Sequence, residues 1–164
     1  MRKLGFILLV AVLSACGSET AQEEVLSEEE SEREVPENAS AFGDQLFLWK
    51  YEDEFSDEEK EKLEKWIVAV GDATINTIGQ YPFDVEVYFH RNDNDSPVSF
   101  GHTDRGVVEG VHFYVNPSFS YEELMEDWTA PHEISHLSLP FSGPRTRWFS
   151  EGYATYLSRR IMID

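Results

Sequence analysis

The chain has 164 residues, which suits one small domain, and its 32 acidic residues outweigh 13 basic ones to give a formal net charge of −19. This charge excludes a nucleic-acid partner, because phosphates need a basic patch. It also excludes a basic surface that holds the protein on an anionic membrane. It favours solubility and cationic substrates.

Residues 1–16 have the pattern of a bacterial export signal. A positive start is followed by the almost wholly apolar stretch Leu4 to Leu13, which is too short to span a bilayer. The stretch ends in Leu-Ser-Ala-Cys, which resembles the lipobox of bacterial lipoproteins, and Cys16 is the only cysteine. The resemblance implies a lipidated Cys16 that tethers an exported protein to a membrane of the cell envelope, the outer one if the cell has two. An ordinary signal peptide with an unrelated cysteine is the alternative.

Residues 17–41 differ in composition from the rest of the chain. They contain nine glutamates between Glu19 and Glu37, one arginine and no aromatic residue. Such a segment cannot bury enough apolar surface to offset the entropy of ordering, so we expect an acidic, disordered linker. The alternative is an acidic tail that binds a basic partner. We expect the folded domain at residues 42–164.

The first part of this domain predicts a helix and then strands. Ser56 and Glu59 form a capping box, and apolar residues at three-and-four spacing continue to Ile78, before Gly79. Alternation predicts a strand at 84–90, and β-rich sequence predicts strands at 98–102 and 110–115, with a loop at 101–106. A second capping box, Ser120 with Glu123, predicts another helix. The fold class is therefore α+β with a short mixed sheet.

A histidine pair marks a candidate metal site. His132 and His136 are four residues apart, so on a helix they point two imidazoles to one ion. Glu133 lies about 100° round the helix, where a carboxylate flanks the ion and can accept a proton from bound water. This H-E-x-x-H pattern is typical of zinc peptidases. Two ordinary helix-face histidines are the alternative reading.

Zinc needs a third protein ligand, and the sequence offers one on a second helical segment. No glycine and histidine follow His136 closely, which excludes the metzincin class. A Ser-Gly-Pro turn at 142–144 lets the chain reverse before the segment Trp148 to Leu157, which contains Glu151.

The segment W-F-S-E-G-Y-A-T-Y-L resembles the W-x-x-E-G-x-A-x-Y-L segment of gluzincin metallopeptidases, including the alanyl-aminopeptidase clan and the small peptidase MA-like domains. The resemblance covers residues 98–157. It implies a zincin-like domain with an N-terminal helix, an active-site helix and a C-terminal glutamate helix. It further implies zinc bound by His132, His136 and Glu151, with Glu133 as the general base that activates water against a peptide or protein substrate.

The chain departs from the family in two places. Thr155 stands where some gluzincins have an aspartate that orients a ligand histidine, which leaves that orienting group unassigned. The family's transition-state tyrosine lies in a region that follows the last residue of this chain, so the candidates for the electrophile are His102, Tyr114 and Arg145. We also expect Val111–Val115 to be the edge strand that pairs with substrate. A catalytically inactive zinc-binding or partner-binding envelope lipoprotein is the alternative function.

Overall fold

The computed structural model describes residues 33–106, 108–140 and 143–162, which belong to one compact unit. The expected export signal, Cys16 and residues 17–32 of the expected linker lie outside the described residues. The first strand begins at Ala39, so three residues that the composition assigned to the linker lie in the sheet. The unit has the α+β architecture expected from the sequence, with a mixed sheet and four α-helices among the described residues.

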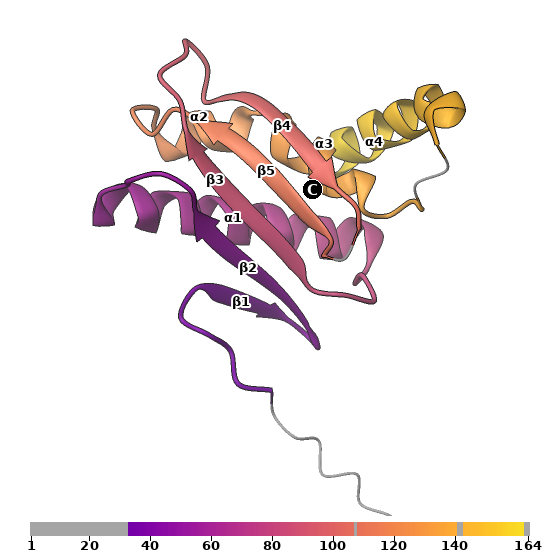
Figure 1. The fold of residues 1–164 in the computed structure, drawn as a ribbon, viewed down its shortest axis with the longest axis horizontal. Helices are drawn as coiled ribbons and strands as arrows, with labels where there is room; N and C mark the ends of the chain where they lie inside the picture. Colours follow the sequence, from indigo (N-terminus) through magenta and orange to yellow (C-terminus); the bar gives the residue numbers. More distant parts are fainter. Residues whose placement is uncertain (1–32, 107, 141–142, 163–164) are drawn as a thin grey trace, which may run out of the picture. The chain divides into compact units, whose positions relative to one another are not determined.

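Five strands form one sheet in the order β1-β2-β3-β5-β4 (Figure 1). Their bounds are β1 Ala39–Phe42, β2 Gln45–Tyr51, β3 Val85–Arg91, β4 Val98–Asp104 and β5 Gly110–Val115. The central pairs β2–β3 and β3–β5 are parallel, whereas β1 and β4 pair antiparallel with their neighbours. The parallel β2–β3 pair needs a crossover, and the helix between these strands provides it.

The edge of the sheet is not the strand expected from the sequence. Strand β5 pairs with β3 on one side and β4 on the other, so the expectation that Val111–Val115 is the edge strand is wrong. Strand β4 occupies that edge and runs to Asp104, two residues beyond the expected strand. The expected loop at 101–106 is therefore mostly strand. The antiparallel pairing across a tight connection places β4 outside β5.

Helix α1, Asp57–Ile78, begins at the predicted capping box, in which Ser56 and Glu59 each bond the other's backbone N–H. The chain leaves the helix at Gly79, whose φ of +98° suits a residue without a Cβ. The helix packs on one face of the sheet, and its buried stripe includes Leu63, Trp66 and Ile67. Buried strand residues such as Phe89 and Phe113 complete the core against Trp66.

Three shorter helices follow the sheet: α2 Tyr121–Glu126, α3 Thr129–His136 and α4 Arg147–Ile161, with a 3₁₀ turn at Pro144–Thr146. The second predicted capping box, Ser120 with Glu123, opens α2. Figure 1 shows α3 and α4 beside each other at the β4 end of the sheet. None of the described helices is both long enough and apolar enough to cross a bilayer.

Candidate metal centre

Helix α3 carries the histidine pair and starts as a new helix after α2. The Asp127 carboxylate accepts the N–H of Thr129 at 2.8 Å, which fixes the first turn. Pro131 lies in that turn, where its missing N–H costs no helical hydrogen bond. Ala130 and Ile134 are fully buried and hold the helix on the core. The opposite side of this anchored helix can therefore present His132 and His136 together.

Helix α4 brings the third candidate ligand. Its buried residues Ala154, Leu157, Ser158 and Ile161 form a stripe at helical spacing. Glu151 lies three residues before Ala154, so it extends from the same side of the helix toward α3. Trp148, in contrast, is 77% exposed and lies outside this buried stripe.

The three candidate ligands converge on one point. Glu151 Oε2 lies 3.3 Å from His132 Nε2 and 3.4 Å from His136 Nε2. The two imidazole rings are perpendicular, with centroids 4.8 Å apart. Ligands bound about 2.0–2.1 Å from a tetrahedral zinc ion are separated from one another by about 3.3–3.4 Å. The donor set and these two distances therefore fit zinc, and His136 and Glu151 also line the cleft described below.

The surroundings of His136 and Glu151 favour the ligating states of these two side chains. Burial lowers the pKa of His136 below its ordinary value, although Glu133 and Glu151 oppose this effect. For Glu151, burial raises the pKa, but His136, Arg147 and His132 outweigh it and lower the net value. Neutral imidazoles and an ionised carboxylate are the forms that bind a metal.

One of the two histidines has an orienting partner. The Ser150 hydroxyl lies 3.1 Å from His136 Nδ1, the nitrogen that points away from the proposed ion. This serine takes the orienting place that the sequence left unassigned. His132 Nδ1 is buried without a hydrogen-bond partner among the described residues, and the Trp128 ring packs edge-on against its imidazole at 4.9 Å.

Glu133 faces the edge strand. Thr103 Oγ1, on β4, lies 2.9 Å from Glu133 Oε2 and 2.7 Å from the Glu133 carbonyl oxygen. Gly101 allows this close approach, since a Cβ there would lie 2.7 Å from Glu133 Cγ and 2.8 Å from Thr129 Cγ2. The glycine and the threonine thus place β4 directly beside the carboxylate.

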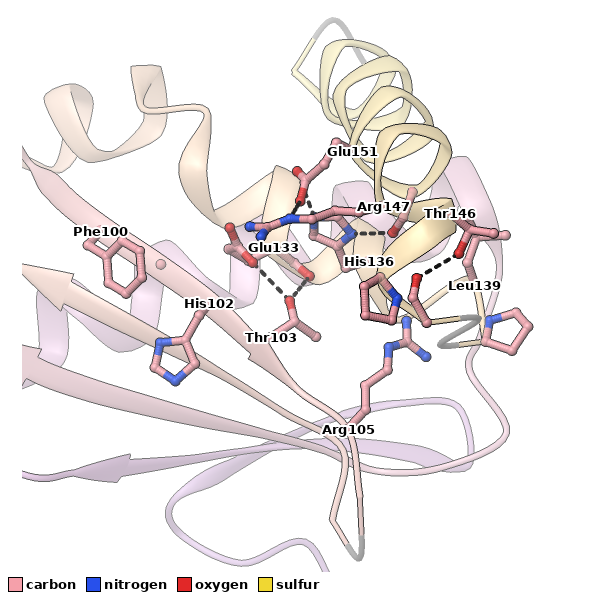
Figure 2. Close-up of a pocket in the computed structure, with 15 residues that line it drawn as sticks. Phe100, His102, Thr103, Arg105, Glu133, His136, Leu139, Thr146, Arg147 and Glu151 are labelled. Carbon is pink, nitrogen blue, oxygen red and sulfur yellow. Dashed lines mark hydrogen bonds and ion pairs between the residues drawn. The ribbon is translucent and has the colours of Figure 1, made fainter.

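A cleft of about 540 Å³ opens beside these residues, between β4 and the start of α4 (Figure 2). It is lined by Glu133, His136 and Glu151 and by two cations, Arg105 and Arg147. Arg147 Nε lies 3.4 Å from Glu151 Oε1. Burial lowers the pKa of Arg105, and Glu109 and Tyr81 oppose this shift. The guanidinium of Arg105 stays charged and supplies hydrogen-bond donors at the cleft wall.

The candidate electrophiles do not all reach this cleft. His102 contributes to its lining, but its ring is directed away from Glu133 (Figure 2), and Tyr114 and Arg145 are absent from the lining. Tyr114 lies on the open face of the sheet, where its ring stacks on His90 at 4.5 Å. Sequence reasoning missed Arg105 and Arg147. Arg147 lies four residues before Glu151, and this spacing is typical of an ion pair on a helix. The spacing could have identified Arg147 from the sequence.

No family model, curated protein or solved structure matches this chain.

Proposed function

We propose that this chain is a zinc-dependent peptidase with a small gluzincin-like zincin domain. His132, His136 and Glu151 bind the ion, and Glu133 is the general base. The observation that carries the proposal is the convergence of Glu151 Oε2 on both imidazoles, at 3.3 Å from His132 Nε2 and 3.4 Å from His136 Nε2, the spacing between two ligands of tetrahedral zinc.

The chain's own residues account for binding and proton transfer. Zinc, when bound, polarises a peptide carbonyl and lowers the pKa of coordinated water. The Glu133 carboxylate would accept a proton from the attacking water at an Oε and could deliver it to the leaving amine. The Thr103 hydroxyl, 2.9 Å from Oε2, holds the carboxylate in place. Ser150 keeps the His136 ring oriented through Nδ1.

Strand β4 is the surface for the substrate. It is the sheet edge beside the cleft, and its outward backbone groups can pair with an extended peptide. Arg105 provides the electrophile or a contact to a carbonyl or carboxylate of the peptide, since the His102 ring is directed away from Glu133 and Tyr114 and Arg145 lie outside the cleft lining. An extended peptide or protein segment is therefore the substrate class.

A zinc and activity assay tests this proposal. The purified chain should contain one zinc at this site, and His132→Ala and Glu151→Ala should each lose it. Glu133→Gln should keep zinc yet cleave a mixed peptide library ~100-fold to 10,000-fold more slowly, the range for loss of a general base. Zinc retained in both ligand variants, or undiminished cleavage by Glu133→Gln, would refute the assignment.

The alternative is an inactive protein that keeps zinc as a structural element. A catalytic zinc has an open coordination position, whereas a structural zinc is closed by four protein ligands. A peptide hydroxamate should therefore bind the zinc-loaded protein and not the Glu151→Ala variant. Failure of the zinc-loaded chain to bind the hydroxamate would favour the structural role.

The lipid tether belongs to the proposal as well. Lipidated Cys16 would hold the domain at a membrane of the bacterial cell envelope, with peptide or protein substrates in the adjoining compartment. Mass spectrometry of the chain made in a bacterial host tests it, because Cys16→Ala should abolish lipid attachment and release the protein from the membrane fraction.

A further inference from the structure

The face of the sheet opposite the helices carries a second cluster of metal-ligating groups. Three of the five histidines in the chain, His90, His102 and His112, lie on the neighbouring strands β3, β4 and β5. Their strand neighbours Phe89, Val111 and Phe113 are buried against the helices, so the histidines point the other way. In Figure 2, Thr103 points toward Glu133, whereas the His102 ring is directed away from it.

Strand pairing brings the second group of donors together. His102 lies directly opposite His112 in the β4–β5 register, and Asp104 follows two residues later on the same face. The His102 and His112 rings stack at 4.5 Å with their planes 7° apart. His112 Nε2 lies 3.3 Å from Asp104 Oδ2, and His102 Nε2 lies 3.9 Å from Asp104 Oδ1. One donor atom from each of the three residues lies within 4.8 Å of the others.

These distances are close to those of a metal site. The His112–Asp104 separation already equals the roughly 3.3–3.4 Å between two ligands of a tetrahedral ion. His102 Nε2, 3.9 Å from Asp104 Oδ1, lies about 0.5 Å beyond this spacing, and its ring has to rotate out of the stack with His112 to direct its lone pair at the same ion. His102 is 37% exposed at its side chain, so the sheet leaves room for that movement.

His90 positions one of the ligands. Its Nε2 lies 2.9 Å from His112 Nδ1, and the Tyr88 ring stacks on the other side of the His112 imidazole at 4.2 Å. When His112 Nδ1–H donates to His90, the lone pair of His112 Nε2 faces the Asp104 carboxylate. A cation between these two atoms removes their repulsion. Metal-ligating histidines commonly donate their second N–H in this way.

The charge of the Asp104 carboxylate also favours a cation at this cluster. The chain as a whole is strongly acidic, which raises the local concentration of cations.

We infer that His102, Asp104 and His112 form a second divalent metal site, on the face of β4 opposite Glu133. Two imidazole nitrogens and one carboxylate select zinc, nickel or copper over calcium and magnesium, which prefer oxygen ligands. The remaining coordination positions are filled by water, because Asp104 is 63% exposed. The site therefore binds more weakly than the buried centre of α3 and α4.

A zinc titration tests this inference independently of the peptidase proposal. The protein is first stripped of metal with a chelator, and its zinc binding is then measured in competition with a chromophoric chelator. The wild type should bind two equivalents. The single variant Glu151→Ala and the double variant His102→Gln/Asp104→Asn should each bind one equivalent. The triple variant that combines them should bind none. Asp93→Asn, which removes an exposed acid from the β3–β4 loop, controls for charge and should bind two. His90→Gln should weaken the second site ~10-fold to 100-fold, as loss of an orienting partner does.

A second measurement needs no change in the cluster. In the Glu151→Ala protein, zinc should protect His102 and His112 from carbethoxylation by diethyl pyrocarbonate, read by mass spectrometry. Equal zinc binding by the wild type and the His102→Gln/Asp104→Asn variant, or unchanged reactivity of both histidines, would overturn the second site. If the double variant His102→Gln/Asp104→Asn loses one zinc equivalent and Glu151→Ala loses none, the second site is supported and the peptidase centre is refuted.

Discussion

Thr103 and Glu133 connect the edge of the sheet to the H-E-x-x-H helix, since the threonine hydroxyl lies 2.9 Å from the Glu133 carboxylate and 2.7 Å from the carbonyl of the same residue. Thr103 belongs to β4 and Glu133 to α3, thirty positions apart in the chain. The contact makes the position of the proposed base depend on the strand that would hold the substrate.

The first prediction concerns this contact. Thr103→Val preserves the shape of the side chain but removes the hydroxyl, so Glu133 loses a hydrogen bond that orients it. We expect zinc content to stay unchanged while kcat falls ~10-fold, because a hydrogen bond to a charged group is worth about 1.5 kcal/mol and about 1.4 kcal/mol is tenfold in rate.

Thr103→Ser supplies the control for this prediction, because it retains the hydroxyl and should restore most of the activity. The pH dependence of kcat/KM should also shift in Thr103→Val, since the environment of the base changes. Equal rates in both variants, or lower zinc content in Thr103→Val, would show that the threonine does not act through Glu133.

The second prediction concerns Ser150 and the ligand His136. Ser150→Ala removes the group 3.1 Å from His136 Nδ1, so the imidazole is less firmly oriented. Loss of an orienting partner typically lowers metal affinity 10-fold to 100-fold, and we expect ~10-fold in a zinc competition assay. Ser150→Thr keeps a hydroxyl and should bind zinc nearly as tightly as the wild type. Unaltered affinity in Ser150→Ala would remove Ser150 from the centre.

The third prediction uses two glycines with opposite roles. A Cβ at Gly101 would lie 2.7 Å from Glu133 Cγ, whereas nothing lies within 4 Å of one at Gly152, in helix α4. Gly101→Ala should lower the free energy of unfolding by about 1–3 kcal/mol through overpacking. Gly152→Ala should raise it by up to about 1 kcal/mol, because alanine favours the helix.

Urea unfolding at fixed pH measures both glycine variants. The sign of the change is the test, since a stabilised Gly101→Ala protein would contradict the close approach of β4 to α3. Peptidase activity should fall only in Gly101→Ala.

The fourth prediction is a pH dependence of stability at Asp84. A hydrogen bond from Arg33 lowers the pKa of Asp84 more than burial raises it, and the Leu46 N–H, which donates at 3.0 Å, lowers it further. A carboxylate with a depressed pKa stabilises the fold fully above its unfolded pKa, about 3.9. That contribution is lost as the pH falls through the lower, folded value.

Chemical unfolding of the wild type and Asp84→Asn between pH 6 and pH 2 checks this prediction. The wild type should be the more stable protein at pH 6, and the difference should shrink as the pH falls below about 4. A difference that is constant across the range would mean that the Asp84 charge contributes no stability.

Local sequence patterns predicted helices well, both in the scaffold and at the site. Both capping boxes open the helices that they predicted, since a cap is formed by residues only three positions apart. The spacing of His132 and His136 was likewise sufficient to place both rings on one face, because helical periodicity is a local property. The segment around Glu151 indicated a second ligand helix, and Glu151 does lie within 3.4 Å of both imidazoles.

The sequence by itself therefore determined the donor residues of the site and the helices that carry them. Only the tertiary structure decided that β4 is the edge strand and that Thr103 and Arg105 meet the site, while Tyr114 does not. It also gathered His90, His102 and His112 on one open face. The physical reason is that strand order and the meeting of separate elements depend on long-range pairing and packing, which local periodicity does not encode.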